Sequence, residues 1–216
     1  MGLPQASDAA DRSILRRSTG WRVPLVLVVV SLMALLPGEG AQRLLRYDRA
    51  DIAAGEFWRL ATGHFVHLGT THLLLNVTGL VIVWFLIGTG FSQLGWAFIT
   101  ALSLVLIDLG FWLLEPGLQW YVGMSGLLHA LLVAGIISRV REAPVESTAL
   151  GLVVAAKITW EQIAGPLPGS EMSAGGPVAV DAHLYGVIAG IIAGIMVGAF
   201  GAVLAYGRAA RGVSIQ

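Results

Sequence analysis

The sequence contains no cysteine, and this absence removes three kinds of chemistry. Without thiols there can be no disulfide framework, no thiol nucleophile and no thiolate metal site. Charged residues are also scarce, at 12% of the 216 residues, whereas soluble domains have about 25%. The net charge is zero and no basic stripe runs along the chain, which argues against nucleic acid as a partner.

What the sequence has instead is long apolar runs. Hydrophobic residues make up 56% of the chain, too much for a single soluble core. The longest runs are each close to the roughly 20 residues that a helix needs to span a bilayer. They are Trp21 to Leu36, Leu73 to Thr89, Leu94 to Leu114 and Val178 to Tyr206. The lipid bilayer is therefore the expected surroundings of this protein.

The pattern predicts an all-α polytopic membrane protein with one bundle of six transmembrane helices. The predicted spans are residues 21–37, 72–91, 94–114, 125–140, 147–164 and 179–206. The six-helix domain is then 21–206, with an N-terminal tail over 1–20 and a C-terminal tail over 207–216. The first run has no small-residue cleavage site, which favours a retained helix over a signal peptide.

Arginines predict the orientation of the bundle. They precede the first helix, separate the fourth from the fifth and follow the sixth, and the positive-inside rule places these segments in the cytoplasm. They are Arg12, Arg16, Arg17, Arg22, Arg139, Arg141, Arg208 and Arg211. Both tails are then cytoplasmic, as an even helix count requires. Four arginines in the first external loop weaken the charge difference on which this orientation rests: Arg43, Arg46, Arg49 and Arg59.

Two loops have distinct compositions. The first, residues 38–71, contains an amphipathic stretch (Gln42 to Tyr47) and is expected to lie in the outer interface. The loop over 165–177 is rich in proline and glycine, which predicts a mobile external segment without helix.

Polar residues inside a bilayer are functional candidates because burying them there is expensive. His72 opens the second predicted helix and Asn76 follows four residues later, so both side chains leave one face. The pair could serve interhelical hydrogen bonding or a functional site. His64 and His67 lie just before, but no thiolate or arranged carboxylate accompanies them, so neither a metal nor another cofactor is expected.

A serine stands in Gly123-Met124-Ser125-Gly126, where a loop turns into the fourth predicted helix. Glycine beside serine is common in membrane helices, since small residues allow close packing. A serine at a helix N-terminus also has its hydroxyl beside free backbone N–H groups, as a nucleophile with an oxyanion site requires.

His183 lies near the start of the sixth predicted helix and is followed by Gly186, Gly190 and Gly194. These glycines allow close packing against a neighbouring helix. If that neighbour is the fourth helix, His183 can approach Ser125 at matching depth. A histidine within hydrogen-bond reach is the usual base that activates a serine.

These pieces, on the second, fourth and sixth predicted helices, resemble the rhomboid intramembrane serine proteases. The resemblance is also carried by Gly55-Glu56-Phe57-Trp58-Arg59-Leu60, then Thr62, Phe65 and His67, and by Ala182 before His183. It implies that Ser125 is the nucleophile and His183 the general base and acid. It further implies an oxyanion hole of His72, Asn76 and the Ser125 backbone N–H, and no aspartate that completes a triad. Gly123, Gly126, Gly186 and Gly190 would pack helices near this site.

Within the family, the chain resembles most the rhombosortases, a compact bacterial branch. Three segments carry this: Gly123 to His129, Lys157 with Trp160-Glu161-Gln162, and Ala174 to Val178 leading to Asp181-Ala182-His183. The resemblance covers about residues 44–195. It implies a bacterial inner (cytoplasmic) membrane protein whose active site faces the extracytoplasmic side. The implied partners are membrane-anchored secreted proteins with a C-terminal tail of a Gly-Gly motif, a hydrophobic helix and a basic cluster.

Four polar residues have more than one interpretation. His129 stands where many rhomboid proteases have a tyrosine packed on the catalytic histidine; it could stack there, or bond to a neighbouring helix. Lys157 and Glu161, four residues apart, are interpreted as neutralising each other rather than as catalytic. Asp108 either partners a neighbouring helix or faces an aqueous cavity.

Competing functions are a generic rhomboid protease of single-span substrates, a catalytically inactive rhomboid relative that binds membrane proteins, and a small transporter. The full set Ser125, His183, His72 and Asn76 argues against an inactive relative. Broken helices or paired half-repeats, typical of transporters, are not evident. The residues do not distinguish hydrolysis of an acyl-enzyme from its transfer to an amine.

Overall fold

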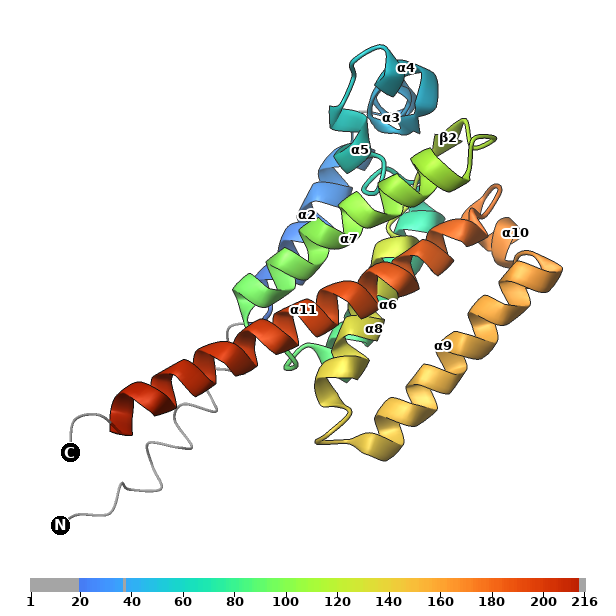
Figure 1. Ribbon diagram of the computed structural model, residues 1–216. Coiled ribbons are helices and arrows are strands. Elements are labelled where there is room, and N and C mark those ends of the chain that lie inside the picture. Colours follow the sequence, from blue (N-terminus) through green and yellow to red (C-terminus); the bar gives the residue numbers. More distant parts are fainter. Residues whose placement is uncertain (1–19, 37, 214–216) are drawn as a thin grey trace.

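All six segments predicted as membrane helices are helical in the computed structural model, which describes residues 20–36 and 38–213 (Figure 1). The helices are α2 (Arg22–Leu35), α6 (Thr70–Ile87), α7 (Gln93–Leu114), α8 (Ser125–Arg139), α9 (Pro144–Ala164) and α11 (Val180–Val213). Among the described residues, α6, α7 and α11 are long and apolar enough to cross a membrane, while α2 and α8 are apolar but shorter. The count of six spans stays a prediction.

The last helix is longer than predicted. α11 runs to Val213 instead of ending at Tyr206, because the residues that follow include alanine and arginine, which favour helix, and no proline. The predicted N-terminal tail, with Arg12, Arg16 and Arg17, lies outside the described residues apart from Gly20.

The prediction that residues 165–177 contain no helix was wrong. A short helix, α10 (Ser170–Ala174), forms inside this segment. Gly169 before it and Gly175 after it adopt left-handed conformations, with φ of 79° and 78°. Glycine adopts these angles without steric cost. The glycines that were expected to exclude helix therefore mark the two ends of a short helix instead.

The first loop folds into three short helices and one short strand. It contains α3 (Glu39–Leu45), α4 (Arg49–Ala53) and α5 (Trp58–Thr62), which gather at the end of the bundle where α11 begins (Figure 1). Between them, strand β1 (Tyr47–Asp48) pairs antiparallel with β2 (Trp120–Tyr121), Tyr47 opposite Tyr121. The pairing fixes the segment that leads into α8 and Ser125.

Arginines hold the first loop together. Arg59 is only 3% exposed and pairs with Asp51 at 2.9 Å and with Glu56 at 2.7 Å. Arg49 donates to carbonyl oxygens at the C-terminus of α7, to Phe111 at 2.5 Å and to Glu115, just after the helix, at 2.9 Å. These loop arginines have structural partners, which accounts for their presence outside the segments predicted to be cytoplasmic.

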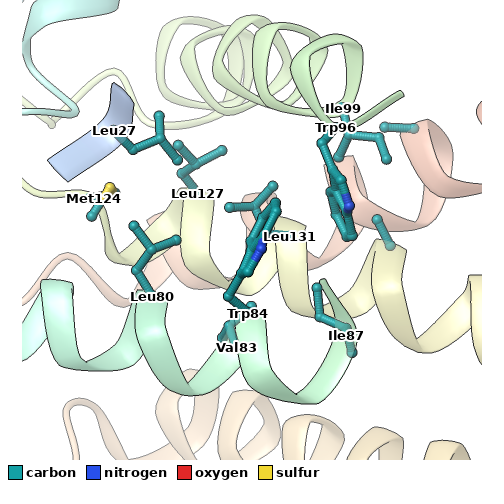
Figure 2. Packing of buried hydrophobic residues seen from close by; sticks show 12 residues of the cluster. Leu27, Leu80, Val83, Trp84, Ile87, Trp96, Ile99, Met124, Leu127 and Leu131 are labelled. Carbon is teal, nitrogen blue, oxygen red and sulfur yellow. The ribbon is translucent and has the colours of Figure 1, made fainter. Parts of the chain in front are cut away.

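The main apolar core surrounds α8. Figure 2 shows α6 side chains directed at Leu127 and Leu131 of α8, with Trp96 and Ile99 of α7 closing the cluster. The α6 residues are Leu80, Val83, Trp84 and Ile87. Because lipid tails are as apolar as these side chains, the cluster is stabilised by close packing rather than by exclusion of water.

Helices α8 and α11 approach each other through glycines. A Cβ placed on Gly126 would lie 2.7 Å from the carbonyl oxygen of Ala182, and one on Gly186 would overlap the backbone of Gly126. Gly190 and Gly194 meet the α8 backbone in the same way further along. This contact brings the N-terminus of α8 beside the first turns of α11.

Candidate active site

Ser125 and His183 form a hydrogen bond. Ser125 is the first residue of α8, and its Oγ lies 2.9 Å from Nε2 of His183, on the first turn of α11. His183 is 5% exposed. At this distance the serine O–H can donate to the imidazole, the arrangement in which histidine removes the proton of a nucleophile.

The other nitrogen of His183 faces two charged residues of α9. Nδ1 lies 2.9 Å from Oε2 of Glu161 and 3.2 Å from Nζ of Lys157. The predicted pairing of Lys157 with Glu161 is present, with Nζ donating to Oε1 at 2.7 Å. The contact of Glu161 with His183 was missed, because the spacing along α9 does not reveal which side chain turns towards α11.

His129 stacks on His183. The ring centroids are 4.5 Å apart and the planes differ by 26°. Nδ1 of His129 lies 2.7 Å from the backbone oxygen of Ser125, so its N–H donates within α8. Of the two interpretations, the structure has the stacked one, and the hydrogen bond is to the residue's own helix rather than to a neighbour.

His72 presents a nitrogen beside the segment that precedes Ser125. The backbone N–H of Leu68 donates to its Nδ1 at 3.3 Å, so the neutral ring carries its proton on Nε2. A Cβ on Gly123 would lie 3.1 Å from that Nε2, and Gly123 has a φ of +122° that favours glycine. Gly123 thus leaves space for the His72 ring and allows the chain to turn before α8. Gly126, Gly186 and Gly190 have a different role, because they let α8 and α11 pack closely.

Asn76 lies one turn after His72 and is buried. Its Nδ2 donates to the backbone oxygen of His72 at 3.1 Å. A primary amide has two N–H donors, so one remains for another acceptor. The side chains of His72 and Asn76 therefore both offer donors from α6, the helix that packs against α8.

The remaining two histidines have structural partners. His64 Nε2 lies 3.1 Å from Oδ1 of Asp108, which therefore partners the loop before α6 rather than a neighbouring helix. Asp108 also lines a cavity of about 600 Å³ between α7 and the first loop. No group of three or more His, Asp or Glu side chains suited to a metal ion occurs among the described residues.

His67 lies in the loop before α6 and is buried. It donates from Nδ1 to the backbone oxygen of Phe65 at 3.0 Å and packs edge-on against His72. Burial, and to a smaller extent the neighbouring His72, lower the pKa of His67 from 6.5 to about 4, although the hydrogen bond to Phe65 raises it. His67 is therefore neutral at physiological pH and supports the position of the His72 ring.

The comparisons with known proteins agree with the sequence resemblance at the level of the family. The model described as the Rhomboid domain matches residues 54–200, a segment that contains Ser125, His183, His72 and Asn76. No curated protein sequence matches the chain significantly. Rhomboid proteins are intramembrane serine proteases, and the match covers more than half of the chain. The chain therefore belongs to the rhomboid family.

Proposed function

We propose that this protein is a serine endopeptidase that cleaves membrane-anchored proteins with a Ser125–His183 dyad. The observation that carries the proposal is the 2.9 Å contact between Ser125 Oγ and His183 Nε2. Serine alone is a weak nucleophile, and a buried imidazole at this distance is the group that activates it.

The reaction follows from this geometry. The Ser125 hydroxyl gives its proton to His183 Nε2 as Oγ attacks the carbonyl carbon of the scissile amide. The protonated imidazole then gives the proton to the leaving nitrogen as the carbon–nitrogen bond breaks. The acyl-enzyme is resolved by water, or by an amine if the enzyme transfers its product.

The developing oxyanion needs donors that already point at it. The backbone N–H of Ser125 is free of an intrahelical acceptor because this residue begins α8. The Nε2–H of His72 and the second N–H of Asn76 are the side-chain donors proposed to join it. Loss of one such donor typically slows the reaction about 10²–10³-fold.

The membrane placement is proposed as six spans with both termini in the cytoplasm. Arg139 ends α8 at the end remote from Ser125 and Arg141 follows it, so the positive-inside rule puts the active site towards the extracytoplasmic side. α8 has 15 residues. Its length of about 22 Å is less than the roughly 30 Å of the hydrocarbon layer, so Ser125 would lie below the outer boundary.

The proposed substrates are secreted or surface proteins of bacteria that carry a C-terminal Gly-Gly motif, a hydrophobic helix and a basic end. Glycine destabilises a helix by about 1 kcal/mol relative to alanine, so a Gly-Gly pair unwinds readily. A groove of about 410 Å³ is lined by residues 117–122, which precede the turn into α8, and by residues 177–179, which precede α11. The proposed route of the extended, side-chain-free segment is through this groove. The basic end would fix the depth of the tail.

The experiment uses the purified protein in liposomes with a single-span substrate that ends in this tail. Wild-type protein should cleave beside the Gly-Gly motif, whereas Ser125→Ala and His183→Ala should not. Replacement of both substrate glycines with leucine should abolish cleavage. Continued cleavage of the leucine substrate at the same rate would favour a generic rhomboid protease. Binding without cleavage by the wild type would indicate a non-catalytic membrane protein.

A further inference from the structure

The catalytic dyad leaves one nitrogen of His183 unused, and a buried carboxylate meets it. Glu161 is 3% exposed and lies at the end of α9 nearest α11. Its two oxygens have different partners: Oε2 contacts His183 Nδ1 at 2.9 Å, and Oε1 accepts from Lys157 at 2.7 Å. The three helices α8, α9 and α11 thus contribute one continuous chain of polar contacts.

We propose that Glu161 is a positioning residue that holds His183 in its catalytic tautomer and that Lys157 holds Glu161 in place. This inference rests on the proposed function, since it concerns the same Ser125–His183 pair. It adds a third member, supplied by α9, to an arrangement that the sequence resemblance implied to be a dyad.

The tautomer argument decides which contact of Nδ1 is the hydrogen bond. Nδ1 cannot donate to Glu161 and accept from Lys157 at once. If it accepted from Lys157, the proton of the neutral ring would sit on Nε2, which could then not take the proton of Ser125. The hydrogen bond to Glu161 leaves Nε2 free as a base, and it persists when the ring becomes an imidazolium.

A purely structural alternative is that Glu161 only neutralises Lys157. An exposed pair four residues apart on a helix stabilises a protein only slightly, whereas burial of a carboxylate is strongly unfavourable unless its partners compensate for the lost water. The lysine side chain is 28% exposed and the glutamate side chain 3%, so the carboxylate is the group that is buried. The pair alone does not offset this cost, and the second hydrogen bond of Glu161, to His183, provides further compensation.

The test compares kcat and KM in liposomes for Glu161→Gln, Glu161→Asp and the double variant Lys157→Met/Glu161→Gln. Glu146→Gln is the matched control, because Glu146 is exposed in the first turn of the same helix. Glu161→Gln should lower kcat about 10²–10⁴-fold, the range for a lost proton-transfer partner or a wrong tautomer, with little change in KM. Glu161→Asp keeps a carboxylate and should lose less activity.

The double variant separates the two interpretations. It removes both charges, so a counterion role predicts recovery of stability and of rate, whereas a positioning role predicts that kcat stays as low as in Glu161→Gln. A double variant or a Glu161→Gln variant with wild-type kcat would overturn the inference. If Glu161→Gln does not fold, the rates of Glu161→Asp and of the double variant decide.

Ser125→Ala is measured in parallel to keep the two proposals apart. If Ser125→Ala also cleaves the substrate, the proposed function fails, and the inference fails with it. If Ser125→Ala is inactive and Glu161→Gln is fully active, the Ser125–His183 dyad stands and only the role of Glu161 is wrong.

Discussion

The glycine contact between α8 and α11 makes a quantitative prediction about catalysis. A methyl group added at Gly126 would lie 2.7 Å from the carbonyl oxygen of Ala182, whereas ordinary van der Waals contact begins at 3.4 Å. The helices must separate by about 0.7 Å to accept it. The Ser125–His183 contact of 2.9 Å would lengthen to about 3.6 Å, beyond the 2.7–3.2 Å of a hydrogen bond.

We therefore expect Gly126→Ala and Gly186→Ala to lower kcat about 10²-fold or more, since misplacement of a base by 1 Å costs on that order. Gly198→Ala on α11 is the matched control, because a Cβ there meets nothing within 4 Å. All three changes favour helix by about 1 kcal/mol, so a general effect of alanine would appear in the control as well. The assay is cleavage in liposomes, with thermal unfolding in detergent to confirm folding. Wild-type kcat in both Gly126→Ala and Gly186→Ala would refute the argument.

Three further predictions concern neighbouring residues. His129→Tyr should remain active because a flat ring can still stack on His183, while His129→Leu should lower kcat; an equally active Leu variant would exclude the stacking role. The contribution of His67 to the free energy of unfolding should fall by about 3 kcal/mol between pH 6.5 and pH 4, because the unfolded chain binds a proton at His67 that the folded protein does not; the midpoint temperature of thermal unfolding should therefore depend less on pH in His67→Phe than in the wild type. Arg59→Ala should lower the unfolding free energy by about 3 kcal/mol, since it removes a buried side chain that bonds the backbone oxygens of Arg43 and Arg46 as well as two carboxylates, whereas Arg43→Ala at an exposed position should change it by less than about 0.5 kcal/mol.

Much of the fold could be predicted because the bilayer imposes a simple pattern. Apolar runs of spanning length marked α2, α6, α7 and α11, and the family resemblance was confirmed over residues 54–200. The short elements were harder to predict. α10 was missed because glycines signal both a loop and the two ends of a short helix. The extension of α11 to Val213 was missed because the polar residues there end the apolar pattern but not the helix.

The site shows the same limit at the level of single side chains. Ser125 and His183 could be paired in advance because both stand at helix starts and glycines predicted close packing. The contact of Glu161 with His183 depends on how α9 is rotated about its axis, and this is set by tertiary packing rather than by spacing along one helix. A buried carboxylate beside a lysine at the end of a helix was the one signal available.

The most direct test of the central claim is whether Ser125 is an activated nucleophile. The protein in liposomes is treated with a fluorophosphonate, which bonds covalently to activated serines. Mass spectrometry of peptides from the protein then locates the adduct. The account predicts an adduct on Ser125 in the wild-type protein, loss of that adduct in His183→Ala and slower formation in Glu161→Gln. An unmodified Ser125 in active wild-type protein, or equal labelling of Ser125 in His183→Ala, would contradict it.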